Sequence, residues 1–448
     1  MEPALMVVGL NYRTAPVAVR ERFWIGEDRR YETLVQLSRG EGIEEVLVMA
    51  TCNRTEFWMW AADVTLAANS VMRLLGAEYG LKLCEWKHFY RLLDEAALLH
   101  IFRVASRLDS MVVGEPQVVG QVQEAWQQAQ KVGATGRFLD AVLQKALTVS
   151  ERVCKETTIC SAAVSIPYAA VELAHQILGT FENKKVLLLG AGEMSELSAC
   201  ELLKHGASPV CMSVANRTLD HAVELAAKIG GLAIPFEERW QHMAEADIII
   251  SSTSCAHTIL SREEAEFMVR GRQSWVRNDD DKHTNDDEPL VIIDIAMPRD
   301  IDAAVRDVKG VVLYDLDDLE NVTGQNAGER EAAAVEAQKI LLAEAQGFRG
   351  KLIAERVVPT VVALRLRLDE LCRQELDSFR LENGPFSKDQ DEMINAMMSR
   401  MTQKIAASLS RELKGLPEKA DQEQMTTALR RLFHLHTAES ASAPTKSA

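Results

Sequence analysis

The sequence predicts a multidomain α/β protein that ends in a helical region. The first observation is residues 185–195, where an apolar strand, a glycine turn and a helix start follow one another. The second is the recurrence of short apolar runs between helical stretches, typical of a doubly wound parallel sheet. The third is residues 318–356, which are rich in Ala, Glu, Gln and Leu, lack proline, and favour a long helix despite several glycines.

Length and composition are those of an ordinary globular chain. At roughly 150 residues a domain, 448 residues suggest about three domains, and 47% hydrophobic with 26% charged residues can supply a sizeable core. The eight cysteines lack CxxC pairs and zinc-ligand spacing, so we expect no disulfide framework, no metal site and a reducing, cytoplasmic location. We expect neither a signal peptide nor a membrane span, since no apolar run approaches ~18 residues.

The net charge of −16 argues against strong non-specific binding of nucleic acid, because Lys and Arg supply the phosphate contacts. A specific nucleic-acid surface would have to be local, with groups such as Arg54, Arg103, Arg107 and the arginines after Pro359. Six acids lie in residues 279–288, which we interpret as a solvated loop before a strand at 290–295.

The first domain, residues 1–160, is expected to be a small α/β unit followed by helices. Strands are predicted at residues 5–10 and 45–49, and a helix begins near Asp94. That helix has an apolar face, from which His100 points away; the residues of this face are Leu98, Ile101, Phe102 and Ala105.

Cys52 is a candidate nucleophile where the strand at 45–49 ends. Arg54 follows two residues later, and a nearby cation favours the thiolate over the thiol if the side chains converge. The alternative is a buried cysteine that packs as a small apolar residue.

A second polar group follows the apolar residues 111–113. Pro116 disfavours helical geometry at Glu115, so we predict that it ends the preceding helix. With Ser110, Gln117 and Gln121, this corner offers hydrogen-bonding groups suited to the ammonium and carboxylate of a small amino acid. The alternative is a loop held by its own turn hydrogen bonds.

The second domain, residues 161–317, contains the glycine turn. Gly190 allows a tight turn, Gly192 allows close approach of a pyrophosphate, and the helix near Glu193 offers backbone amides to it. Ser195 stands where a dinucleotide fingerprint has its third glycine, so a βα turn that binds no nucleotide stays open. The cofactor-contacting residues predicted here are Gly190, Ala191, Gly192, Glu193, Met194 and Ser195.

A predicted second strand, residues 209–214, leads to Asn216, Arg217 and Thr218. No acid stands where an NAD site places its ribose-binding carboxylate, whereas Arg217 and Thr218 suit a 2′-phosphate, so we favour NADPH over NADH. Further buried parallel strands are predicted at residues 246–250, 291–295 and 311–314.

Helical repeats of apolar residues continue after Pro359 and again after a break at residues 383–385. Two or three thin helices cannot bury such stripes alone, so dimerisation is expected. The stripes comprise Leu364, Leu368, Leu371 and Leu376, and then Met393, Met397, Met401, Ile405 and Leu409.

Eight short stretches occur in a characteristic order along the chain: residues 8–17 (VGLNYRTAPV), 51–54 (TCNR), 110–117 (SMVVGEPQ), 190–194 (GAGEM), 215–218 (ANRT), 251–254 (SSTS), 294–300 (DIAMPRD) and 314–319 (YDLDDL). Each motif alone is weak, but the ordered set closely resembles glutamyl-tRNA reductase. The resemblance implies a catalytic domain at residues 1–160, a Rossmann-type NADPH-binding domain at 161–317, a long connecting helix with a dimerisation domain at 318–437, and a disordered tail at 438–448.

The same resemblance implies a reaction and its residues. Glutamyl-tRNA(Glu) would be reduced by NADPH to glutamate-1-semialdehyde, with release of tRNA, in the first step of the C5 route to 5-aminolevulinate and tetrapyrroles. Cys52 would form a thioester, His100 falls where the family has a histidine important for activity, and a complex with glutamate-1-semialdehyde aminomutase is a candidate interaction. The glutamyl pocket would be lined by Thr51, Cys52, Asn53, Arg54, Ser110, Glu115, Pro116, Gln117 and Gln121.

Three residues depart from the family pattern: Tyr12 replaces a frequent His, Ala50 replaces Ser, and Arg107 replaces Gly. None removes a named catalytic group. Two rival classes remain at this stage. An ordinary NADP-dependent dehydrogenase would work without RNA, and a catalytically silent tRNA-binding paralogue would have lost the thiol.

Overall fold

The computed structural model describes residues 3–111, 114–160, 165–255, 257–276, 289–323, 327–384, 386–416 and 419–435. By its internal contacts the chain forms two compact units, of which one is Leu5–Leu341 and the other comprises Met1–Ala4 and Leu342–Ala448. The predicted loop at 279–288 and the predicted tail at 438–448 lie outside the described residues.

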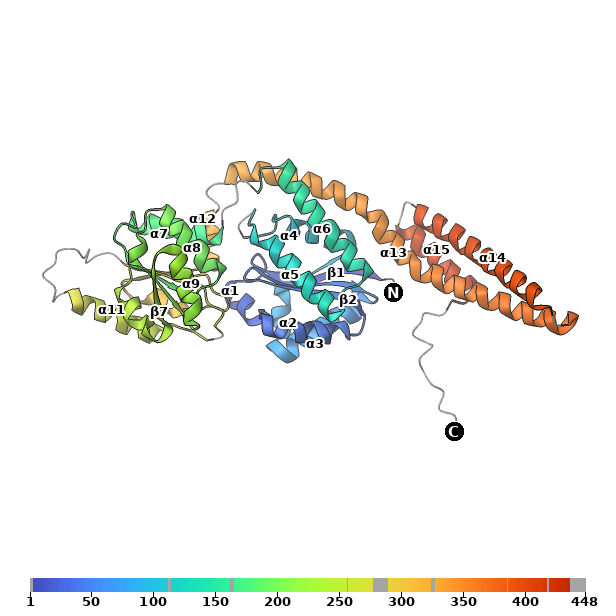
Figure 1. Ribbon diagram of the computed structural model, residues 1–448, viewed down its shortest axis with the longest axis horizontal. Helices are drawn as coiled ribbons and strands as arrows, with labels where there is room; N and C mark the ends of the chain where they lie inside the picture. The colour runs from blue at the N-terminus through green and yellow to red at the C-terminus, as the bar shows by residue number, and fades with distance from the viewer. Residues whose placement is uncertain are drawn as a thin grey trace, which may run out of the picture. The chain divides into compact units, whose positions relative to one another are not determined.

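The N-terminal part is built around a sheet that includes β1 and β2 (Figure 1). This sheet has four strands, in the order β2-β3-β1-β4. All eight residues of β1 and of β3 are buried, as expected for strands covered on both faces. Both predicted strands are confirmed within two residues. The strands are β1 (Ala4–Asn11), β2 (Ile43–Ala50), β3 (Arg54–Ala61) and β4 (Tyr90–Leu93).

The helices of this part pack against the sheet and against one another. The apolar face predicted after Asp94 is buried in α4, with Leu98, Ile101 and Phe102 fully covered. The helices are α1 (Val17–Arg20), α2 (Glu27–Ser38), α3 (Val64–Tyr79), α4 (Asp94–Ala105), α5 (Gln117–Val132) and α6 (Arg137–Glu156).

Pro116 begins a helix rather than ending one, so that prediction is wrong. Helix α4 has already ended at Ala105, and Pro116 is the N-cap of α5. Proline suits the start of a helix because the first turn has no use for its missing N–H. The residues of the predicted polar corner therefore lead into α5.

Gly9 on β1 lies in close contact with β3. A Cβ at this position would stand 2.5 Å from the Thr55 carbonyl oxygen and 2.7 Å from Glu56 Cα and Cγ. On its other side Gly9 pairs with Tyr90 of β4. Only a residue without a side chain fits between these strands.

A six-stranded parallel sheet follows, in the order β10-β9-β8-β5-β6-β7. With the strands numbered from β5 and the sheet read from β7, this is the 3-2-1-4-5-6 order of a dinucleotide-binding sheet, in which the strand order reverses between β5 and β8. The strands are β5 (Val186–Leu189), β6 (Met212–Asn216), β7 (Leu232–Pro235), β8 (Ile248–Ser251), β9 (Leu290–Asp294) and β10 (Val311–Asp315).

Helices lie around this sheet in Figure 1, namely α7 (Ile166–Leu178), α8 (Glu193–Lys204), α9 (Leu219–Ile229), α10 (Arg239–Glu245), α11 (Arg262–Val276) and α12 (Leu316–Thr323). Two details differ from the prediction. Residues Pro209–Cys211 form a 3₁₀ turn that delays β6 to Met212, and the edge strand β7 was missed because only Ile234 of its four residues is buried.

Among the described residues, three helices follow α12: α13 (Ala327–Asn383), α14 (Lys388–Gly415) and α15 (Lys419–Leu432). The long helix predicted at 318–356 is instead divided between α12 and α13, and α13 continues through Pro359. Leu413 and Leu429 form a small core with Val361, Leu409 and Phe433, so the three helices pack together. Together with the two sheets, they confirm the predicted fold class.

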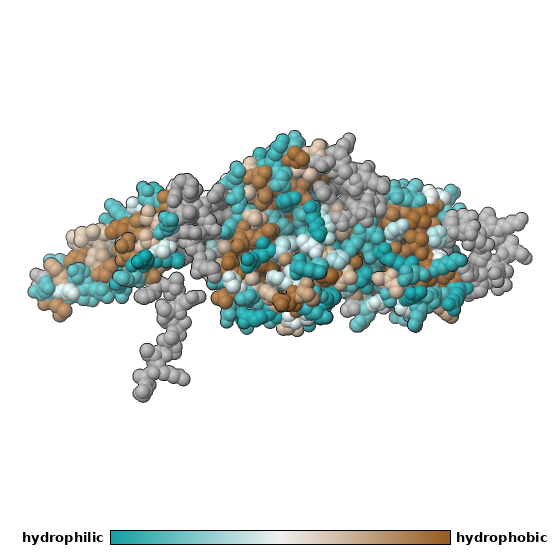
Figure 2. Space-filling view, turned by 180° about the vertical axis from the view of Figure 1, so that it is seen from behind, coloured by the Kyte–Doolittle hydropathy of each residue, from teal (hydrophilic) through white to brown (hydrophobic). Residues whose placement is uncertain are grey.

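Much apolar surface stays exposed on these helices (Figure 2). The predicted stripe on α14 is uncovered within one chain, with Met393 74%, Met397 56%, Met401 54% and Ile405 43% exposed. Such a run requires another apolar surface to cover it.

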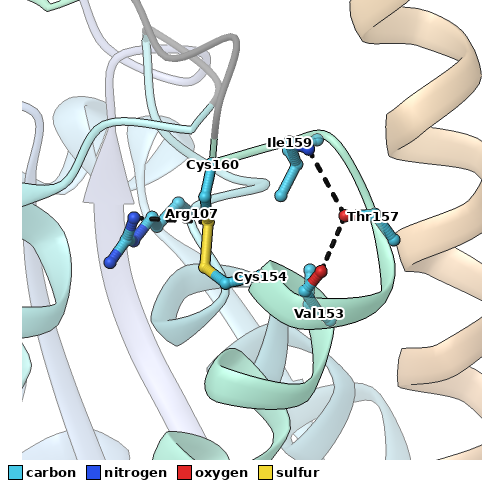
Figure 3. Close-up of a disulfide and its surroundings, with 6 residues drawn as sticks. All are labelled: Arg107, Val153, Cys154, Thr157, Ile159 and Cys160. Atoms are coloured by element: carbon cyan, nitrogen blue, oxygen red, sulfur yellow. Dashed lines mark hydrogen bonds between the residues drawn. A yellow bond between two sulfur atoms is a disulfide. The ribbon is translucent and has the colours of Figure 1, made fainter.

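One cysteine pair departs from the expectation of unpaired thiols. Cys154, in the last turn of α6, forms a disulfide with Cys160, and their Cα atoms are 5.3 Å apart (Figure 3). The backbone leaves α6 at Thr157, whose hydroxyl donates to the Val153 carbonyl, and the chain turns back far enough for the sulfurs to meet. A spacing of six residues carries no sequence signal for this contact. The other six cysteines are free, and none of the described helices is long and apolar enough to cross a membrane.

Candidate active site

Cys52 lies in the turn that joins β2 to β3. The backbone N–H of Thr51 donates to the Arg54 carbonyl at 2.8 Å, and that of Asn53 donates to Thr51 Oγ1 at 3.2 Å. The Cys52 carbonyl accepts a hydrogen bond from Arg20 Nε at 3.3 Å. The turn is thus held both by its own residues and by an arginine from α1.

The half-buried Cys52 faces a cavity of about 630 Å³. Five predicted substrate residues line it, namely Thr51, Cys52, Pro116, Gln117 and Gln121. Glu193 and Leu197 of α8 and Met297 line it as well, so the thiol and the helix after the glycine turn share one cavity. Sequence reasoning predicted no site role for Leu197 or Met297, and it also missed the remaining lining residues, which are Trp24, Glu27, Arg30, Met49, Ala50, Gly120, Glu124 and Ala125.

The thiol is less acidic than the sequence suggested. Burial, and then the Glu115 carboxylate, raise the pKa of Cys52 to about 12, against smaller opposing effects of Arg20 and Arg54. Arg54 does act to lower this pKa, as predicted, but its effect is smaller than those of burial and Glu115. Desolvation and a nearby negative charge both disfavour the thiolate.

Arg54 is committed to other partners. Its side chain is almost fully buried, and Nη1 lies 2.6 Å from Glu56 Oε1 and 3.1 Å from Asp109 Oδ2, while Nη2 donates to the Asp109 carbonyl. The carboxylates of Glu56 and Asp109 therefore compensate the positive charge of Arg54. Arg54 was expected to contribute to a surface that binds nucleic acid, but its burial excludes that role. Arg103 and Arg107, which were expected on the same surface, are only partly exposed.

Glu56 connects Arg54 to His100. Its Oε1 accepts hydrogen bonds from Arg54 and from the Tyr90 hydroxyl (2.5 Å), and its Oε2 accepts from Trp58 Nε1 (2.6 Å) and His100 Nε2 (3.0 Å). Burial acts to raise the pKa of Glu56, but the His100 and Arg54 charges and these hydrogen bonds hold it well below its ordinary value. Glu56 therefore fixes the orientation of His100, as a carboxylate does for a catalytic histidine.

Three predicted substrate residues, none of which is among the residues that line the Cys52 cavity, have a buried polar atom without a hydrogen-bond partner among the described residues: Asn53 Oδ1, Ser110 Oγ and Glu115 Oε2. Burial raises the pKa of Glu115 to about 7 against the opposing charge of Arg54. Unpaired buried polar groups are costly, so a cluster of them indicates a site that a polar ligand completes.

The glycine turn fits a dinucleotide. Gly190 has φ +105°, and a Cβ there would come within 3.0 Å of the Ser252 carbonyl oxygen, whereas a Cβ at Gly192 would meet nothing within 4 Å. Gly192 caps α8 without a side-chain hydrogen bond, which leaves the first amides of α8 available to an anion. Ser195 is buried with Oγ 2.6 Å from Ser252 Oγ, so a small residue suffices where a third glycine was expected.

Arg217 and Thr218 are exposed directly after β6, beside the glycine turn of the neighbouring strand β5. Asn216 Nδ2 donates to the Thr218 carbonyl at 2.8 Å and shapes this loop. The first acid after β6 is Asp220, inside α9, so no carboxylate stands where an NAD site places its ribose ligand.

Tyr12, whose role the family pattern left in doubt, supports the site. Its hydroxyl donates to the Ser110 carbonyl at 3.0 Å and accepts from Arg13 Nε at 2.9 Å. The Ala50 carbonyl accepts from Arg30 Nη2 at 2.9 Å, and Arg107 Nη1 donates to Cys160 Sγ at 3.3 Å (Figure 3). Ala50 lines the cavity, whereas Arg107 contacts the disulfide, and none of the three residues supplies the nucleophile.

A dinucleotide-type sheet and a cysteine that share one cavity define an oxidoreductase of the dehydrogenase type with a thiol beside its nucleotide site. Comparison with known proteins agrees in each part of the chain. Residues 172–322 match the model of the shikimate/quinate 5-dehydrogenase family. Residues 8–157 match the N-terminal domain of glutamyl-tRNA reductase, and residues 336–435 match its dimerisation domain.

Similarity to whole proteins is equally extensive. The glutamyl-tRNA reductase of Desulforudis audaxviator is 40% identical over 98% of this chain and 96% of its own, and glutamyl-tRNA reductase 2 of Koribacter versatilis is 37% identical over 96% and 95%. The structure of glutamyl-tRNA reductase from Methanopyrus kandleri, at 28% identity, covers 96% of this chain and 99% of its own with a TM-score of 0.51. The chain belongs to the glutamyl-tRNA reductase family.

Proposed function

We propose that this chain uses NADPH to reduce glutamyl-tRNA(Glu) to glutamate-1-semialdehyde, releasing tRNA, through a thioester on Cys52. This is the first step of the C5 route to 5-aminolevulinate and tetrapyrroles. The observation that carries the proposal is the single cavity lined by Cys52 and by Glu193 at the start of α8. An acyl group held on the thiol would lie next to the nucleotide site.

The unpaired polar atoms support an amino-acid substrate. Glu115 offers a carboxylate for the α-ammonium, while Ser110 and Asn53 offer a hydroxyl and an amide oxygen. Binding of the ammonium beside Glu115 would also offset the negative charge that disfavours the Cys52 thiolate. Substrate binding would therefore activate the nucleophile as well as position the ester.

Acyl transfer breaks the ester bond to the 3′-oxygen of tRNA and forms the thioester bond to Cys52 Sγ. The thiol gives up its proton, and the departing 3′-oxygen takes one; we assign delivery of that proton to His100 or to a water that it positions. Its partner Glu56 keeps the imidazole in one orientation. A thioester carbonyl accepts hydride more readily than a carboxylate does, which is the chemical reason for the covalent step.

NADPH, when bound, supplies the hydride that reduces this acyl group to the aldehyde. The turn at Gly190–Gly192 with the first amides of α8 would hold its pyrophosphate, and Arg217 with Thr218 would hold the 2′-phosphate. The predicted contacts of Ala191, Glu193, Met194, Ser195 and Asn216 belong to the same proposal.

We place the enzyme in the cytoplasm as a homodimer joined through its C-terminal helices. The match to the dimerisation family and the exposed stripe on α14 support the dimer. The product is a reactive amino aldehyde, which favours its transfer to a bound glutamate-1-semialdehyde aminomutase. The predicted domain limits at 160, 317 and 437 form part of this proposal.

The decisive experiment incubates the protein with charged glutamyl-tRNA and NADPH and traps the aldehyde. We expect product only when both are present, and none from Cys52→Ser, because a hydroxyl without an adjacent base is a far poorer nucleophile. Oxidation of NADPH without charged tRNA would point to an ordinary dehydrogenase. Near-normal turnover by the serine variant would exclude the thioester.

A second assay omits NADPH and measures free glutamate. Because the thioester can form before reduction, we expect slow hydrolysis of glutamyl-tRNA by the wild type and much less by Cys52→Ala. Equal release by both would show that Cys52 is not acylated without the cofactor.

A further inference from the structure

Arg20 is a buried cation that sequence reasoning did not single out. Only 2% of its side chain is exposed, and its Nη1 donates to the Ala15 carbonyl at 3.1 Å. Its Nε donates to the Cys52 carbonyl at 3.3 Å, and among the described residues its Nη2 has no partner. The guanidinium therefore lies directly behind the turn that carries the thiol.

The counter-charge of Arg20 comes from the far end of the nucleotide-binding part of the chain. Asp317 Oδ1 lies 3.0 Å from Arg20 Nη1, and Asp317 Oδ2 accepts from the Val17 backbone N–H at 2.8 Å. Asp317 stands in the first turn of α12, where Leu316 and Leu319 are buried in the same apolar core as the sheet. One carboxylate of α12 thus holds the start of α1 and the arginine that contacts Cys52.

We propose that Arg20 is a positioning residue that links the nucleotide-binding domain to the reactivity of Cys52, because its guanidinium is shared between the Cys52 carbonyl and Asp317. With Asp317 in place, the carboxylate holds one side of the guanidinium and offsets part of the arginine charge that the thiol experiences. When Asp317 is withdrawn, the guanidinium is held by the Cys52 turn alone, and its uncompensated charge favours the thiolate.

The other charges around Cys52 do not provide such a link. Arg54 is fixed by Glu56 and Asp109, and the buried Glu115 Oε2 has no hydrogen-bond partner in the part of the chain that the structure describes. Charged residues that line the cavity are Glu27, Arg30, Glu124 and Glu193. Arg20 combines a bond to the Cys52 turn with an ion pair to the other domain. This interpretation rests on the proposed function. It implies that Cys52 reacts fastest with the ester when the nucleotide-binding domain, and with it Asp317, has moved away from Arg20.

The test measures alkylation of Cys52 by iodoacetamide in the full-length protein, following the Cys52 peptide by mass spectrometry from neutral to alkaline pH. For each pH unit by which the midpoint of Cys52 ionisation shifts, the alkylation rate at a fixed pH below that midpoint changes by about three- to four-fold. The thiolate fraction changes ten-fold, but a thiolate of lower pKa is less nucleophilic, which offsets part of that change. We expect Asp317→Asn to raise this rate by about three-fold or more, and Arg20→Gln to lower it by a similar factor.

The chain supplies a matched control in the ion pair between Glu21 and Arg299. It joins the same two parts, with Arg299 Nη2 2.7 Å from Glu21 Oε1, but has no hydrogen bond to Cys52. Glu21→Gln should leave the pH profile of alkylation unchanged. A shift equal to that of Asp317→Asn would overturn the proposal, since any loosening of the domains would then suffice.

A double variant tests whether Asp317 acts through Arg20. In the Arg20→Gln background, Asp317→Asn should have a clearly smaller effect, because no guanidinium is left for Asp317 to share with the Cys52 turn. An equal effect in both backgrounds would mean that the carboxylate acts on the thiol directly, and it would refute the link. Asp317→Asn changes a partly exposed carboxylate, so it provides a test even where loss of the buried arginine impairs folding. An unchanged profile in Asp317→Asn also refutes the proposal. Alkylation requires neither tRNA nor NADPH, so failure of the reductase assay would leave this result interpretable.

Discussion

Replacing Glu56 with glutamine should destabilise the N-terminal domain and misplace His100, although the side chain keeps its shape. Each carboxylate oxygen faces one donor that cannot become an acceptor: Arg54 at Oε1 and the Trp58 indole at Oε2. Whichever way the amide is turned, its NH₂ group faces an N–H. The variant therefore loses hydrogen bonds and leaves the buried Arg54 charge less compensated.

The expected loss is about 3 to 5 kcal/mol, the usual effect of breaking a buried ion pair by removing one partner. For a domain of this size, each kcal/mol corresponds to about 2 to 4 °C, so Tm should fall by roughly 6 to 20 °C. Because the pKa of Glu56 lies well below its ordinary value, its contribution is full above the unfolded pKa of about 4.3 and is lost as pH falls towards the folded pKa. The variant should therefore lose less stability than the wild type when the pH falls below about 4.3.

Calorimetry at neutral and acidic pH measures both effects. Glu41→Gln is the matched control, because Glu41 pairs with Arg73 at 3.2 Å on the exposed surface and such pairs contribute about 0 to 1 kcal/mol. A Tm for Glu56→Gln within about 2 °C of wild type at neutral pH, less than the shift for 1 kcal/mol, would refute the view that Glu56 holds this cluster together.

Three further predictions follow from other residues. Glu115→Gln should raise the stability, and with it Tm, by about 3 to 4 kcal/mol at pH 8 but not at pH 4, because the raised pKa of Glu115 means that its ionisation between about 4.3 and about 7 opposes folding; equal effects at both pH values in calorimetry would contradict this. Arg217→Asp should remove the preference for NADPH over NADH in kcat/KM, and an unchanged ratio would show that the 2′-phosphate binds elsewhere. Met401→Glu should shift the protein towards monomer in analytical ultracentrifugation, whereas Gln403→Glu, about 160° away around α14, should not; equal dissociation by both would argue against the stripe.

The fold was largely predictable because parallel strands are buried on both faces and therefore form apolar runs that stand out in the sequence. Strands β5, β8, β9 and β10 were found in this way within two residues. Strand β7 was not, because an edge strand with three of its four residues at least partly exposed has no such run. The early end of α4 was also missed, since Pro116 is as compatible with a helix start as with a helix end.

The site was only partly predictable, because its chemistry depends on contacts between distant segments. The sequence placed Cys52 beside Arg54 but gave no indication that Glu56 and Asp109 neutralise that arginine. The alternation of Arg54, Glu56 and Trp58 along β3 puts them on one face, which was the available signal for the cluster. For Arg20 there was none, as its partner Asp317 lies 297 residues further along the chain.

Gly9 has a consequence for anyone who would transplant this active site into another scaffold. The hairpin that carries Cys52, Arg54 and Glu56 looks like a portable motif, since its functional groups lie within five consecutive residues. Yet Glu56 reaches its position only because the adjacent strand presents a bare backbone there, and a single methyl group would collide with Thr55 and Glu56. A recipient sheet must therefore provide a glycine in the same register on the neighbouring strand. Without it, the cysteine would be transferred but the network that orients His100 would not.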